Sequence, residues 1–187
     1  MLWLNRFQED HMAVVRLLAK LEGNLKDLEY GEAGVNAIWD LREFAEIIRN
    51  VIIPHFKNEE KTVYPKASGV GGEARKFMTG MCEEHEDLYV AFEGFFKALG
   101  GETGEKEAAG KDKIAAQIIS ASVNADREEA PKNIERVAEV RYLDEEINKG
   151  EILKYGYKIV QLLKEHIEKE ETTVAELVKK AEESERG

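Results

Sequence analysis

Two stretches of this sequence decide its fold: HFKNEEKTVYP at residues 55–65 and its echo HIEKEETTVAE at residues 166–176. In each stretch a histidine is followed four positions later by a glutamate and then by a second glutamate. Residues four apart share one face of an α-helix, so each His/Glu pair points to one spot. The spacing therefore predicts two helices whose paired side chains enclose a metal centre.

The composition indicates a soluble helical protein of one domain. The 187 residues suffice for a sizeable core, and 43% of them are hydrophobic and 35% charged. A formal net charge of −11 argues against nucleic acid as a main partner, since phosphate binding needs a basic surface. No apolar run approaches the ~18 residues of a membrane helix, and the first residues lack a signal-peptide pattern. The single cysteine, Cys82, cannot form an internal disulfide, which predicts a cytoplasmic location.

Four stretches carry apolar residues at helical spacing and are separated by glycine-rich breaks. They predict core helices at roughly 4–29, 35–66, 77–99 and 151–183. Pro54 removes a backbone hydrogen bond from the second helix and should bend it just before His55. Residues 101–150 carry the pattern of two further helices, with Pro131 suited to a helix start. We therefore expect an all-α single domain over residues 1–187, with this helical region inserted between the third and fourth core helices.

Each of the four histidines interrupts the apolar stripe of a different predicted helix. They stand where the periodicity would place a leucine: His11, His55, His85 and His166. Glu59 and Glu170 also lie on these stripes, and a carboxylate that faces a helical core is costly unless it is paired, hydrogen-bonded or bound to metal. A lone histidine on an apolar face is usually only a core residue. Six such residues on four stripes favour a metal cluster.

Donor counting favours two iron ions. Four imidazoles and two bridging carboxylates supply eight bonds, and a bridging oxide or hydroxide adds two, so two octahedral ions keep one open position each. Two-metal sites hold their ions roughly 3.5–4 Å apart, a span that one carboxylate can bridge. Mixed imidazole and carboxylate donors with open positions suit non-haem iron, whereas zinc prefers four donors.

Four neighbouring residues admit both a structural and a functional interpretation. Glu60 and Glu171 point about 100° away from the adjacent glutamates, and are either surface residues or acceptors that orient a ligand histidine. Tyr64 either packs in the core or donates a hydrogen bond to a bound oxygen species. Cys82 lies one helical turn before His85 and is either a small buried residue or a neighbour of the site.

These segments resemble the hemerythrin-like cation-binding family, whose members are often called HHE domains. The matching pieces are DHMAVVRLL from Asp10, PHFKNEEKTVYP from Pro54, EEHEDLYVAF from Glu83 and KEHIEKEE from Lys164. The resemblance implies an up-down-up-down four-helix bundle with a di-iron centre in its core. It also implies that the four histidines are terminal iron ligands and that Glu59 and Glu170 are bridging carboxylates.

Two departures from that family bear on function. Oxygen-carrying hemerythrins use five histidines, arranged three and two, whereas this chain has four in total. A two-and-two arrangement is expected here, which argues against a simple oxygen carrier. The predicted insertion at 101–150 is longer than the family's third connection, and three roles stay open for it: capping the bundle, forming a homodimer interface or screening the site.

The leading hypothesis is a non-haem di-iron protein that binds or reacts with a small oxidant: dioxygen, peroxide or nitric oxide. One alternative is an iron or oxygen sensor, or an iron donor for the repair of iron–sulfur centres, without catalytic turnover. Another is a helical interaction protein without metal. Elemental analysis and the visible spectrum of the purified protein separate these alternatives.

Overall fold

The computed structural model describes residues 2–31, 35–100 and 147–184, and the secondary structure in these ranges is helical throughout. The prediction of an all-α helical bundle is thereby confirmed. The predicted insertion falls almost wholly on residues 101–146, outside the described residues. No helix in the described ranges combines the length and the apolar character that a membrane crossing requires.

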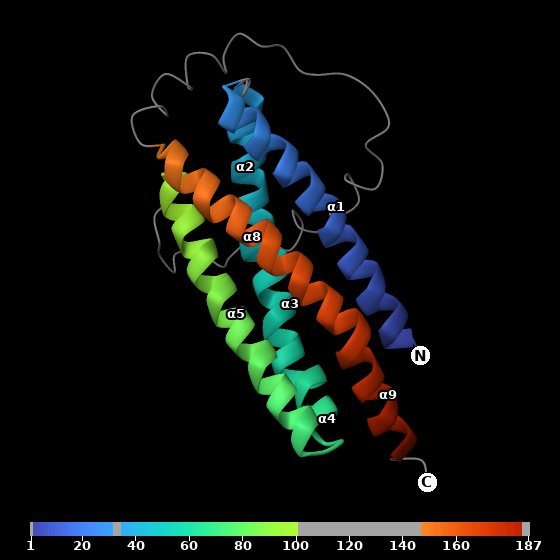
Figure 1. The fold of residues 1–187 in the computed structure, drawn as a ribbon. Coiled ribbons are helices and arrows are strands. Elements are labelled where there is room, and N and C mark those ends of the chain that lie inside the picture. Colours follow the sequence, from blue (N-terminus) through green and yellow to red (C-terminus); the bar gives the residue numbers. More distant parts are fainter. Residues whose placement is uncertain (1, 32–34, 101–146, 185–187) are drawn as a thin grey trace.

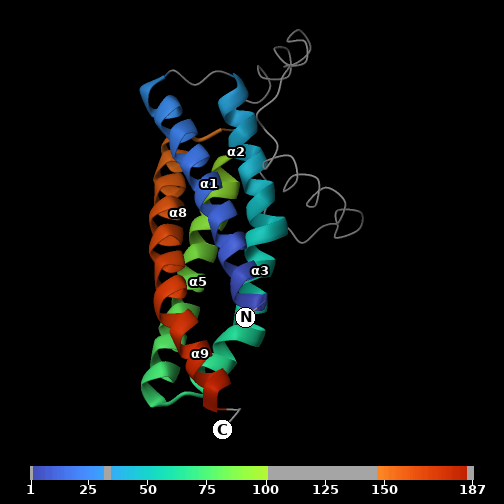
Figure 2. The ribbon, with the colours of Figure 1, turned by 90° about the vertical axis from the view of Figure 1, so that its right-hand side faces the viewer.

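Four helical rods make up the bundle (Figure 1). The first rod is α1 (Leu2–Tyr30), and the third is α5 (Gly72–Ala98). The second rod consists of α2 (Val35–Ile47), η1 (Ile48–Ile52), α3 (Ile53–Asn58), η2 (Glu59–Val63) and α4 (Tyr64–Ser68). The fourth rod consists of α8 (Lys149–Lys169), η3 (Glu170–Val174) and α9 (Ala175–Ser184). Figures 1 and 2 show consecutive rods running in opposite directions, with both chain ends at the same end of the bundle. Packing of α1 on α2 and α8, and of α5 on α8, α2 and α4, closes the rods around one interior.

The third rod ends beside the start of the fourth. After α5 comes Gly100, whose left-handed φ of 74° is a conformation that favours glycine and ends the helix. Asn148, which precedes α8, donates its backbone N–H to Ala98 O at 3.0 Å. The Asn148 side chain then caps α8 by accepting from the Glu151 N–H at 3.1 Å.

Two apolar clusters fill the interior and leave a polar layer between them. The larger cluster includes Leu18, Phe56, Phe92 and Leu163, and the smaller one includes Tyr64, Met81 and Val174. On the second rod Glu59 comes between Phe56 and Tyr64, and on the fourth rod Glu170 comes between Leu163 and Val174. The candidate site therefore lies at the junction of the two clusters.

Three π-helical turns interrupt the second and fourth rods. In η1 the Ile53 N–H bonds to Ile48 O, five residues back, immediately before Pro54. Proline lacks an N–H and its ring crowds the preceding turn, which accounts for a widened turn at this point. The other two turns, η2 and η3, begin at Glu59 and Glu170, and π-helical turns often occur at functional sites.

Candidate metal centre

The structure brings together all six residues that the sequence singles out as metal ligands. They come from all four rods: His11 from α1, His55 from α3, Glu59 from η2, His85 from α5, His166 from α8 and Glu170 from η3. Five of these side chains are buried, and that of His55 keeps 20% of its surface exposed. Carboxylates and imidazoles buried in one layer must find their partners there, because water is excluded.

The donor atoms form two groups that share two residues. One group is His11, His55, Glu59 and Glu170, and the other is His85, His166, Glu59 and Glu170. Within each group the donor atoms lie within 4.8 Å of one another. Both glutamates belong to both groups, as a carboxylate that bridges two ions would.

Each shared carboxylate directs one oxygen to each group. Glu59 Oε1 lies 2.7 Å from His55 Nε2, and Glu59 Oε2 lies 3.7 Å from His85 Nε2. On the other glutamate, Glu170 Oε2 lies 3.1 Å from His11 Nε2, and Oε1 lies 3.6 Å from the Nε2 atom of His166. A carboxylate that bridges through both oxygens requires this division.

The spacing of the donors suits metal binding. Nitrogen and oxygen donors bind metal ions such as zinc at roughly 2.0–2.2 Å, so adjacent donors on one ion lie about 3 Å apart. His85 Nε2 and His166 Nε2 are 2.9 Å apart. The Glu59 side chain is buried, and its Oε1 lies 2.7 Å from His55 Nε2. These donor–donor distances are close to those between adjacent ligands of one ion.

Tyr64 closes one side of the group around His85 and His166. Its hydroxyl donates a 2.7 Å hydrogen bond to Glu170 Oε1 and lies 3.2 Å from His85 Nε2 and 3.5 Å from His166 Nε2. The side chain is buried, and burial raises the pKa of the phenol above its usual value. The second repeat has Ala175 at the equivalent position, so it supplies no second tyrosine hydroxyl. The two repeats therefore differ in the side chain that they provide at this point. Tyr64 therefore belongs both to the site and to the smaller apolar cluster.

Two of the residues with open roles approach the outer nitrogens of the histidines. Glu60 Oε1 lies 2.6 Å from His85 Nδ1, within hydrogen-bond distance. Glu171 Oε1 lies 3.6 Å from His11 Nδ1, which is too long for a hydrogen bond. A carboxylate at Nδ1 fixes the imidazole tautomer and leaves Nε2 available to a metal, so Glu60 is placed to orient the His85 ring.

Glu84 is a residue of the site that the sequence analysis missed. Its Oε2 lies 3.0 Å from His166 Nδ1, and its Oε1 accepts from Lys169 Nζ at 2.6 Å. Burial raises the pKa of Glu84, but His166 and Lys169 lower it below its usual value. Glu84 stands next to His85 in the chain yet contacts a histidine of another rod, and no spacing within one helix reveals such a pairing.

Charges in the metal-free site compensate one another. Burial alone lowers the pKa of His11, but the carboxylates of Glu170 and Glu59 raise it to about 9. For Glu59 burial raises the pKa, but His11 and the neighbouring imidazole of His55 lower it to about 2. The pKa of His85 is lowered, by burial first. At neutral pH an imidazolium at His11 therefore faces an ionised Glu59.

Backbone geometry places the two shared glutamates. The N–H groups of Tyr64 and Ala175, which directly follow η2 and η3, bond to the carbonyl oxygens of Glu59 and Glu170, five residues back. A threonine hydroxyl in each widened turn donates to the carbonyl four residues earlier, Thr62 to Asn58 at 2.6 Å and Thr172 to Glu168 at 2.7 Å, a bond that tends to bend a helix.

Cys82 is better explained by packing than by metal binding. It packs against the smaller apolar cluster, and burial raises the pKa of its thiol. A thiol must lose its proton to bind a metal, so this environment works against a ligand role.

Comparison with known proteins points to cation binding. The family model of the hemerythrin HHE cation-binding domain matches residues 4–123. That range includes His11, His55, Glu59 and His85, whereas His166 and Glu170 lie beyond it and reach the site through the packing of the fourth rod. Neither a curated protein nor a solved structure matches the chain.

Proposed function

Because the chain belongs to the hemerythrin HHE cation-binding domain family, we propose that it holds two iron ions and binds or reacts with a small oxidant: dioxygen, peroxide or nitric oxide. The proposed ligands are the six residues of the polar layer: His11, His55, Glu59, His85, His166 and Glu170. The single cysteine fits a cytoplasmic location for this protein.

One observation carries the proposal: Glu59 and Glu170 each direct one oxygen toward each of two histidine pairs. A single ion would need only one group, whereas two ions roughly 3.5–4 Å apart need donors that belong to both. The set of four imidazoles and two carboxylates favours iron over zinc and leaves open positions for an external ligand.

Bound iron would supply the electrons for chemistry with an oxidant, and the chain supplies the surroundings. The apolar clusters on both sides of the layer limit the access of water to it. The Tyr64 hydroxyl holds its proton at Oη and donates a 2.7 Å hydrogen bond to Glu170 Oε1, which fixes the position of this carboxylate. Phe56 stacks on the His85 ring at a centroid distance of 4.0 Å and helps to fix its orientation.

Iron analysis combined with visible spectroscopy tests the proposal. The purified protein is reduced without air and then exposed to dioxygen or nitric oxide, and we expect a change in the visible spectrum. The double variant His55→Ala with Glu59→Ala should lose iron and the change together, whereas Glu176→Ala, an exposed glutamate of α9, should keep both. A protein that contains no iron, or one whose reduced form is spectrally inert to these gases, would overturn the proposal.

A further inference from the structure

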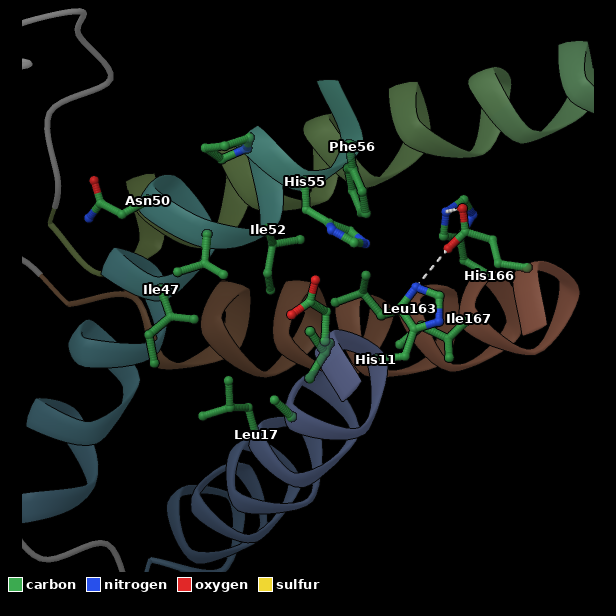
Figure 3. A pocket seen from close by; sticks show the side chains of 16 residues that line it. His11, Leu17, Ile47, Asn50, Ile52, His55, Phe56, Leu163, His166 and Ile167 are labelled. Carbon is green, nitrogen blue, oxygen red and sulfur yellow. Dashed lines mark ion pairs between the residues drawn. The ribbon is translucent and has the colours of Figure 1, made fainter. Parts of the chain in front are cut away.

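A cavity opens beside the candidate metal centre. It has a volume of about 380 Å³ and lies between α1, the η1–α3 stretch of the second rod and α8. His11, His55, His166 and Glu170 line it together with apolar side chains (Figure 3). Of the six candidate ligands, only Glu59 and His85 are absent from its lining.

The cavity is larger than the proposed oxidants need. A water molecule occupies about 30 Å³ in the liquid, so this volume corresponds to about a dozen non-hydrogen atoms. Pockets of at least roughly 300 Å³ typically take organic ligands rather than diatomic gases. A path for gas alone would not require a space of this size.

The walls of the cavity are apolar on all three sides. Val14 and Leu17 come from α1, Val51 from η1, and Leu163 and Ile167 from α8. Figure 3 shows Leu17, Leu163 and Ile167 among the side chains that surround the space.

Away from the metal centre the cavity offers little to a polar group. Asp10 and Asn50 are exposed residues of the lining, and the Asn50 amide already donates to Glu46 O at 2.9 Å. Among the described residues, the lining includes neither lysine nor arginine. A polar group buried at this end would lose its hydration among apolar side chains.

We propose that this cavity binds a neutral, apolar organic molecule of about a dozen non-hydrogen atoms, with one end against His11 and His55. The inference rests on the proposed function in one respect, because such a molecule would lie beside the iron-binding layer as a second ligand. The binding itself follows from the cavity.

Two neutral ligands of equal chain length test the proposal: octanol, which has one polar end, and octane-1,8-diol, which has two. Isothermal titration calorimetry on the iron-loaded protein should show saturable binding of one octanol per chain. Octane-1,8-diol should bind at least about tenfold more weakly, because its second hydroxyl must be buried among apolar side chains. Absence of saturable octanol binding, or equal affinity for the diol, would overturn the inference.

Adjacent residues of α1 supply a matched pair of variants. Val14 lines the cavity, so Val14→Phe should fill it and weaken octanol binding at least about tenfold. Val15 is 44% exposed and does not line the cavity, so Val15→Phe should leave the affinity unchanged. Equal loss of affinity in both variants would contradict the assignment. If Val14→Phe does not fold, Val51→Phe fills the space from η1, and the comparison of octanol with octane-1,8-diol needs no variant.

Iron content and the response to dioxygen are measured on the same samples. Iron binding and a spectral response without octanol binding would refute the cavity inference alone. Octanol binding to a protein that takes up no iron would refute the proposed function alone.

Discussion

The Tyr64 hydroxyl donates a 2.7 Å hydrogen bond to Glu170 Oε1, and thereby joins two residues that are 106 positions apart in the chain. The donor belongs to the first histidine–glutamate repeat and the acceptor to the second. This bond ties the second rod to the fourth within the polar layer. It also gives a buried carboxylate a neutral partner in the absence of metal.

Loss of this hydrogen bond should destabilise the metal-free protein. We expect Tyr64→Phe to lower the free energy of unfolding by about 1–3 kcal/mol, since the Glu170 oxygen stays buried without its donor. Tyr89→Phe is the control, because Tyr89 is half-buried on α5 and its hydroxyl makes no hydrogen bond to a described residue. Urea denaturation of both metal-free variants measures the difference. Equal urea midpoints for the two variants would show that the bond contributes nothing.

The carboxylates at the outer nitrogens should control metal affinity without being ligands. Glu60→Gln and Glu84→Gln remove the charges beside the Nδ1 atoms of His85 and His166, and each should weaken iron binding by roughly 10–100-fold. The number of ions bound at saturation should not change. Competition with a chelator measures the affinity, and the exposed Glu86 provides the control Glu86→Gln. A lower saturating number of ions would instead make Glu60 or Glu84 a ligand.

Metal binding should release protons at neutral pH. The pKa of His11 is raised to about 9, so its imidazole is protonated at pH 7 and must lose that proton to bind a metal. The pKa of Glu59 is about 2, so this residue releases none. The apparent affinity should therefore rise from pH 6 to pH 9 and level off above it. Calorimetry at pH 7 in buffers of different ionisation enthalpy reports the released protons, and a heat that is the same in every buffer would contradict this expectation.

Close contact between α1 and α8 should make Gly156 sensitive to any added side chain. A Cβ at Gly156 would lie 2.6 Å and 2.8 Å from the two methyl groups of Leu25, which is fully buried and would have to shift against its core neighbours. We expect Gly156→Ala to destabilise the protein by about 1–3 kcal/mol. Gly80→Ala on α5 is the matched change, because a Cβ there meets nothing within 4 Å and should stabilise the helix by about 0.4–1 kcal/mol. Thermal unfolding of the two variants should shift in opposite directions, and a shift in the same direction would refute the packing argument.

Much of the bundle could be predicted because its signals are periodic. Apolar residues at helical spacing predict each rod and the face that it turns to the interior. A histidine that stands in place of a leucine on this face is therefore predicted to point into the interior. His11 and His85, which have no neighbouring HxxxE motif, lie in the layer with the two repeats for this reason. The insertion predicted at 101–150 stays a prediction.

Contacts between rods could not be predicted from the same signals. The pairing of Glu84 with His166 depends on the rotation of α5 against α8, which the period of either helix leaves undetermined. The π-helical turns at Glu59 and Glu170 depend on hydrogen bonds that compete closely with ordinary helical ones. For Tyr64 the sequence left open core packing and a hydrogen bond to a bound oxygen species. The structure shows the packing, together with a hydrogen bond to Glu170 that the sequence did not predict, and the bond to an oxygen species stays a prediction.

The number of iron ions per chain tests the central claim most directly, because that claim is that Glu59 and Glu170 serve two ions at once. We predict two ions in the iron-loaded protein, one in His55→Ala, which removes a donor from one group only, and fewer than one in Glu59→Ala, which removes a donor from both. Circular dichroism confirms that each variant is folded before the iron is counted. One ion in the unaltered protein, or two ions retained in Glu59→Ala, would contradict a shared carboxylate bridge.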